Sequence, residues 1–201
     1  MRRHNDLAGR RAFGEKQFLT EGQFLRFAVR PEEDRMTKRQ KTYATFETLE
    51  EQLAHCYFIL HERFIANPQL SKFWTETAIA ELQHASILRF CRERNLMAEA
   101  DIDFSTVDHV EQLLETVKGI ISDIEVSVDE AFYAALLMES SELDDVYQKL
   151  IGALAKEHRP LIDSIHADLR SHHVAFADAA ERFCGDRGMA EAFRNMSRRV
   201  S

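Results

Sequence analysis

The chain has 201 residues, of which 45% are hydrophobic and 30% charged, so it is long enough for one globular domain with a sizeable core. Seven glycines and three prolines are few for this length, which favours long helices over many short strands. Three scattered cysteines without a Cys-x-x-Cys pair exclude a zinc ribbon and a disulfide framework, and reduced thiols are typical of a cytoplasmic protein.

The formal charge of −8 is unevenly distributed along the chain. Residues 1–42 hold 11 Lys and Arg against 6 Asp and Glu, whereas residues 43–201 hold 15 against 28. The acidic body argues against nucleic acid as the main partner. We expect residues 1–42 to be a basic, partly disordered extension, because they lack sustained periodicity. No run of 18 apolar residues occurs, so we expect no membrane span.

The first two predicted helices form a hairpin. Apolar residues recur at three- and four-residue steps over residues 45–66, as on the buried side of a helix. Thr48 and Glu51 have the spacing of a capping box, so the regular helix can begin there. Asn67 and Pro68 are typical of a helix start, which predicts a second helix over residues 68–95.

The second half of the chain repeats this plan. After a connector at residues 96–105, periodicity predicts a shorter helix at 107–121, a long helix at 128–154 and a fourth that begins near Pro160 and ends near Gly185. A last amphipathic helix is expected at residues 189–196. The prediction is an all-α up-down four-helix bundle (43–184) of two helical hairpins with a short crossover helix, followed by a C-terminal helix and tail (185–201).

Acidic and imidazole groups stand at matching depths in the two hairpins. Glu50 lies 17 residues before Asn67, and Glu81 and His84 lie 14 and 17 residues after it. Because a helix rises about 1.5 Å per residue, equal counts on antiparallel helices bring side chains to one level. Around His158, the same count selects three residues, which are Glu139, His172 and His173.

Buried carboxylates are costly unless something neutralises them, and a metal ion does so. The predicted metal ligands are therefore Glu50, Glu81, His84, Glu139 and one of His172 and His173. Tyr57 and Tyr147 are expected to be core residues with hydrogen-bonded hydroxyls.

This pattern resembles the rubrerythrin-type branch of the ferritin-like superfamily over roughly residues 43–178. Each half of that family has a Glu with a Tyr seven positions on, followed about thirty residues later by Glu-x-x-His. Glu50 with Tyr57 and Glu81 with His84 match the first half, and Glu139 matches the second, with Tyr147 eight positions on. The resemblance implies a ferritin-like bundle with two iron ions, chemistry on oxygen, peroxide or iron(II), and a homodimer.

The fourth helix departs from the family pattern. With His172 aligned, Leu169 takes the place of the expected carboxylate, and with His173 aligned, Arg170 takes it. Asp168 can substitute only through a shifted geometry, and the rubredoxin-like tail that delivers electrons is missing from this sequence. Two hypotheses follow. The first is a non-haem iron oxidoreductase with one or two iron ions, or with manganese or zinc instead. The second is a non-catalytic helical interaction module whose site has decayed and binds no ion.

Overall fold

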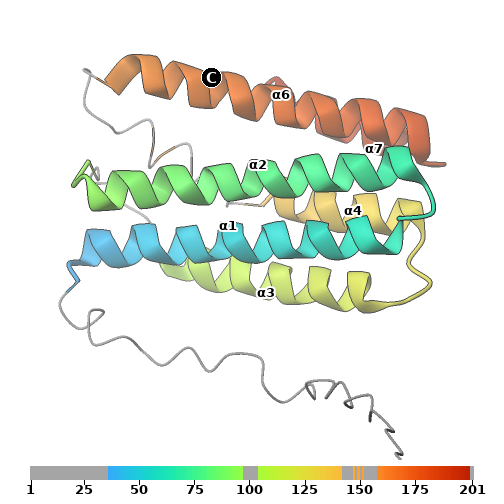
Figure 1. Ribbon diagram of the computed structural model, residues 1–201, viewed down its shortest axis with the longest axis horizontal. Helices are drawn as coiled ribbons and strands as arrows, with labels where there is room; N and C mark the ends of the chain where they lie inside the picture. Colours follow the sequence, from blue (N-terminus) through green and yellow to red (C-terminus); the bar gives the residue numbers. More distant parts are fainter. Residues whose placement is uncertain are drawn as a thin grey trace, which may run out of the picture. The chain divides into compact units, whose positions relative to one another are not determined.

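A computed structural model describes residues 36–96, 104–141, 147, 149, 151 and 158–199, all within one compact unit that spans Met36–Ser201. In this described part of the chain the regular structure is helical and there is no strand, which confirms the all-α prediction (Figure 1). Residues 1–35 of the predicted extension lie outside the described residues. The fold therefore rests on how the helices begin, end and pack.

The first hairpin consists of α1 (Lys38–Arg63) and α2 (Pro68–Glu93). The Asn67 side chain accepts a hydrogen bond from the Leu70 backbone N–H at 3.3 Å and caps α2, with Pro68 in its first turn. The predicted turn is thereby confirmed, and it sets the register between the two helices.

The predicted start of the first helix was wrong. A capping box of Thr37 and Gln40 begins α1, so residues 38–42, assigned to the extension, are already helical. Thr48 instead donates to the Ala44 carbonyl at 2.9 Å inside the helix. Its spacing to Glu51 was thus coincidental, because a threonine within a helix can bond back to the preceding turn.

Two shorter helices follow, α3 (Phe104–Ser122) and α4 (Val128–Glu139). Ser127 and Glu130 form the capping box of α4. The predicted uninterrupted helix over residues 128–154 was wrong, because α4 ends at Ser140. The Ser140 hydroxyl bonds to the Leu136 carbonyl at 2.6 Å, and serines of this kind compete with the helical backbone pattern. Residues 147, 149 and 151 are again helical.

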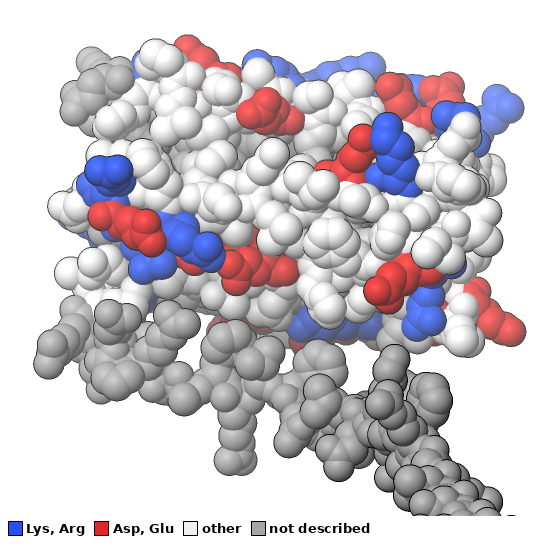
Figure 2. Space-filling view, in the orientation of Figure 1, with Lys and Arg blue, Asp and Glu red and all other residues white. Residues whose placement is uncertain are grey.

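The last helices are α6 (Arg159–Phe183) and α7 (Arg187–Ser197), close to their predicted positions. In space α2 lies between α1 and α6, α3 packs on α4 and α1, and α7 packs on α6 and α4 (Figure 1). None of the helices in the described ranges is long and apolar enough to cross a membrane. On the face shown in Figure 2, charged side chains of both signs are interspersed with uncharged areas.

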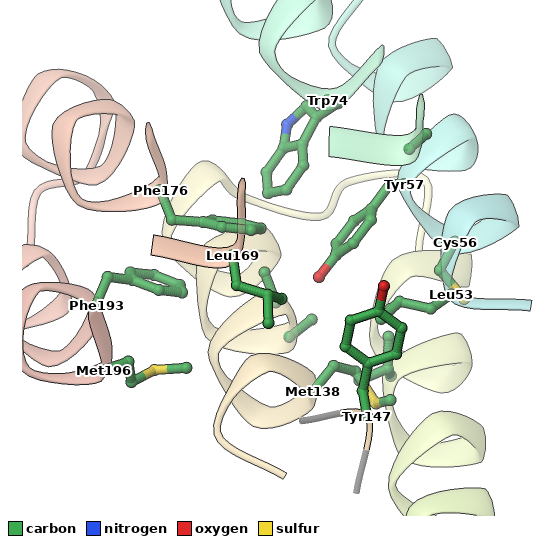
Figure 3. Packing of buried hydrophobic residues seen from close by; sticks show 14 of the residues in the cluster. Leu53, Cys56, Tyr57, Trp74, Met138, Tyr147, Leu169, Phe176, Phe193 and Met196 are labelled. Carbon is green, nitrogen blue, oxygen red and sulfur yellow. The ribbon is translucent and has the colours of Figure 1, made fainter. Parts of the chain in front are cut away.

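An aromatic cluster fills one part of the core. Trp74 is fully buried, and its ring centroid lies 4.9 Å from those of Phe73 and Phe132 and 5.7 Å from that of Tyr57. Figure 3 shows Trp74 and Tyr57 of this cluster together with Phe176 from α6 and Phe193 from α7. Burial of such rings supplies much of the free energy that stabilises a small helical domain.

Candidate metal site

The six side chains predicted as metal ligands all lie in the interior. Glu50, Glu81 and Glu139 are 2%, 3% and 4% exposed, and the His84 and His173 side chains are likewise buried. The His172 side chain is 8% exposed. Four helices contribute them, namely α1 with Glu50, α2 with Glu81 and His84, α4 with Glu139, and α6 with His172 and His173.

The first group of potential ligands joins α1 to α2. His84 Nδ1 lies 2.9 Å from Glu81 Oε2 and 3.9 Å from Glu50 Oε2. The three residues offer ligand atoms that all lie within 4.8 Å of one another. This group could therefore hold a metal ion, and it unites residues that the count from Asn67 placed at one depth.

The second group joins α2, α4 and α6. His172 Nε2 lies 3.1 Å from Glu81 Oε1 and 3.3 Å from Glu139 Oε2. Glu81 thus belongs to both groups and directs a different oxygen toward each histidine. A carboxylate placed in this way can bridge two ions.

Glu81 Oε1 and His172 Nε2 are buried, and within the described ranges neither has a hydrogen-bond partner. They are close together, yet they do not meet in hydrogen-bonding geometry. Two ligand atoms on one ion have this relation, because bonds of about 2.0–2.2 Å hold them roughly 3.0–3.5 Å apart. The buried residues therefore fit a metal ion in both spacing and donor type.

In the absence of a metal, His172 compensates part of the negative charge of the cluster. Burial alone would lower the pKa of His172, but the adjacent charges of Glu139 and Glu81 raise it well above its usual value. Burial likewise opposes ionisation of Glu81, but the imidazoles of His84 and His172 lower the pKa of its carboxyl. A protonated His172 between two carboxylates thus offsets part of the cost of burying them.

Tyr57 supports the cluster from α1. Its hydroxyl donates to Glu139 Oε1 at 2.5 Å, which confirms the predicted hydrogen bond and leaves Oε2 facing His172. Burial and the charge of Glu139 raise the pKa of Tyr57 well above 10, so the phenol remains a donor. Figure 3 shows the hydroxyls of Tyr57 and Tyr147 directed into one region beside Leu169. The partner of Tyr57 lies 82 residues away, and the sequence carried no signal for it.

Four residues of α6 differ in their position relative to the cluster. His172 joins the second group, whereas His173 Nε2 lies farther off, at 3.6 Å from Glu139 Oε2. The resemblance calls for a carboxylate at position 169, but Leu169 stands there and is fully buried in the apolar core. Asp168 is exposed and lies one turn before His172.

A pocket of about 250 Å³ borders the cluster between α2 and α6. Its lining includes His84 and His172 from the cluster, together with Tyr147, whose ring centroid lies 4.8 Å from that of His84. The sequence analysis missed this pocket. A faint signal existed in the i and i+4 spacing of Asp168 and His172, which puts a carboxylate and an imidazole on one helix face.

Residues outside the cluster have simpler roles. His55 and His109 are exposed, while His61 Nδ1 lies within hydrogen-bonding distance of the hydroxyls of Ser71 and Thr75. Burial raises the pKa of each cysteine, to about 11 for Cys56 and Cys91 and about 12 for Cys184. All three are therefore thiols at neutral pH, and none belongs to either ligand group.

Comparisons of the chain with models of protein families, with curated proteins and with solved structures find no match. The functional argument therefore rests on the geometry of the buried carboxylates and histidines.

Proposed function

We propose that this chain is a ferritin-like metal-binding protein, similar to the rubrerythrin-type branch, with iron as its ion. The observation that carries the proposal is the pair of buried ligand groups that share Glu81. In this proposal α1, α2, α4 and α6 form the two hairpins of a four-helix bundle around the ions. A homodimer, which the resemblance implies, belongs to the same proposal and is checked by light scattering.

The donor set favours iron or manganese. Carboxylate oxygen with imidazole nitrogen suits both ions, and zinc accepts the same donors. The three carboxylates, Glu50, Glu81 and Glu139, carry −3 when ionised. With neutral imidazoles, one divalent ion leaves the cluster at −1 and two leave it at +1, so either occupancy brings the buried charge near zero.

We further propose a non-haem iron oxidoreductase. Bound iron would supply one-electron redox chemistry toward peroxide or oxygen, or iron(II) would itself be the substrate, with peroxide or oxygen as the oxidant. The residues of the chain would hold the ions and orient the ligands around them. Glu81 would join the two groups, and the Tyr57 hydroxyl would fix Glu139 through its second oxygen. Trp74 and Phe176 would exclude water from this end of the cluster.

A helical interaction module without chemistry is the second candidate. Leu169 favours it, because the resemblance calls for a carboxylate at that position. The pairing of His172 with Glu81 and Glu139 also neutralises part of the buried charge without an ion.

Metal analysis separates the two candidates. Iron, manganese and zinc per chain are measured after anaerobic loading and gel filtration, for the natural chain and for Glu81→Gln. The proposal predicts one or two ions per chain, almost complete loss in Glu81→Gln with helicity unchanged, and peroxide consumption only in the iron-loaded natural chain. Glu93→Gln is the matched control, because Glu93 is exposed on the same helix. A natural chain that retains no metal would contradict the metal-binding proposal and leave the interaction module as the remaining candidate.

A further inference from the structure

The pocket between α2 and α6 leads from the surface to both ligand groups. At its inner end it contacts His84, which belongs to the first group, and His172, which belongs to the second. At its rim lie exposed side chains, among them Glu76 from α2 and Asp168 from α6. The two helices lie side by side (Figure 1), and residues of both line the pocket.

The rim of the pocket is acidic. Glu76 pairs with Lys72 at 3.2 Å, but both side chains are more than 60% exposed, so water and salt screen that pair strongly. Among the residues that the structure describes, Asp168 has no ion-pair partner, and no Lys or Arg lines the pocket. The rim therefore presents two carboxylates whose field attracts cations and repels anions.

The inner end of the pocket lies against a histidine of the second ligand group, whose Nε2 atom faces Glu81 and Glu139. His172 Nε2 is buried and has no hydrogen-bond partner in the described part of the chain. Asp168 and His172 stand at i and i+4, so they lie on one face of α6 and mark an outer and an inner position along the pocket. An exposed carboxylate at the rim, followed inward by a buried histidine beside Glu81 and Glu139, suits a cation that loses its water stepwise as it moves inward.

We propose that this pocket is the entrance through which a divalent metal cation reaches the buried cluster, with Glu76 and Asp168 attracting it at the rim. The inference rests on the proposed metal-binding function and adds a route to it. It assigns a role to two exposed carboxylates that are not among the predicted ligands. The rim residues should then govern the rate of metal uptake, while the buried ligands govern how much metal is held.

The test measures the rate of Co²⁺ uptake by the metal-free full chain in a stopped-flow instrument. Trp74 is the only tryptophan and lies against Tyr57, which bonds to Glu139, so quenching of its fluorescence by Co²⁺ reports arrival at the cluster. Glu76→Gln combined with Asp168→Asn removes the rim charges. Glu111→Gln combined with Glu125→Gln removes the same charge from exposed sites that do not line the pocket.

The rim variant should take up Co²⁺ about three- to tenfold more slowly at low ionic strength, with unchanged final stoichiometry and circular dichroism. The difference should shrink below about twofold near 0.5 M salt, where charges are screened within a few ångströms. Equal rates in the rim variant and the natural chain, or equal slowing in the control, would overturn the entrance. A natural chain that binds no Co²⁺ would overturn the proposed function itself, and this outcome is visible before any variant is compared.

Discussion

The helical core has an aromatic part and a charged part, and burial affects the stability of the two parts in opposite directions. Around Trp74, rings from α1, α2, α4 and α6 bury one another and need nothing beyond the chain. Around Glu81, three carboxylates and the histidines are buried just as deeply, where ionised groups are costly. The aromatic part therefore stabilises the fold, whereas burial of the charged part has a cost that a bound cation would offset.

The largest expected effect tests the aromatic part. Phe132→Ala should lower the free energy of unfolding by about 3–5 kcal/mol, because Phe132 is fully buried between Phe73 and Trp74. The loss should be the same with and without metal, as measured by urea denaturation. Tyr133→Ala is the matched control, since Tyr133 neighbours it on α4 but is half exposed. A loss below about 1 kcal/mol would show that the aromatic cluster does not stabilise the fold as described.

A slightly smaller effect is expected when an ionisable group is placed at an apolar position of the core. Leu169→Glu places a carboxylate at a fully buried position, so the metal-free variant should lose about 2–5 kcal/mol of stability. Saturating iron(II) or manganese(II) should restore more stability in this variant than it adds to the natural chain. Leu169→Met, which conserves volume, controls for packing. An equal gain from metal in all three proteins would contradict the expectation, which the resemblance supplies, that a carboxylate at position 169 reaches an ion.

The support that Tyr57 gives to Glu139 is expected to matter less. Tyr57→Phe removes one hydrogen bond to a proposed ligand and should weaken metal affinity about 10- to 100-fold, the usual range for such supporting contacts. Competition with a chelator of known affinity measures the change. Tyr133→Phe removes a hydroxyl from an exposed ring and should leave the affinity unaltered. If the two variants behave alike, the bond between Tyr57 and Glu139 does not organise the site.

The smallest expected effect is a dependence of metal affinity on pH. The charges of Glu139 and Glu81, outweighing burial, raise the pKa of His172, so metal must displace a proton from it near neutral pH. Affinity should therefore fall as the pH falls, by about tenfold per unit for one released proton. Isothermal titration calorimetry in two buffers of different ionisation enthalpy counts that proton. A count of zero would mean that His172 is neutral before the ion arrives.

The turn of the first hairpin could be predicted because local chemistry decides it. The Asn67 cap and Pro68 are sequence signals that act within one turn, and the tight connection made the depth count to Glu50 and Glu81 reliable. In the predicted second hairpin the same count brought Glu139 and His172 together, although the helix that carries Glu139 ends at Ser140. Ser140 and Ser141 are a sequence signal for the end of that helix, and a prediction from apolar periodicity alone does not use it.

Other features depend on contacts between distant residues, and these leave no local pattern. The bond from Tyr57 to Glu139 and the shared position of Glu81 arise only when four helices have packed. The choice between His172 and His173 depends on the rotation of α6, which two adjacent histidines cannot reveal. The pocket requires the spacing between α2 and α6, and only tertiary structure supplies it.

Anomalous diffraction from crystals of the metal-loaded protein tests the central claim most directly. Data collected at the iron or manganese absorption edge locate each ion without assumptions about its ligands. We predict one or two peaks beside Glu81, bounded by Glu50 and His84 on one side and by Glu139 and His172 on the other. Peaks found only at exposed carboxylates, with Glu81 Oε1 and His172 Nε2 left without an ion, would contradict the account.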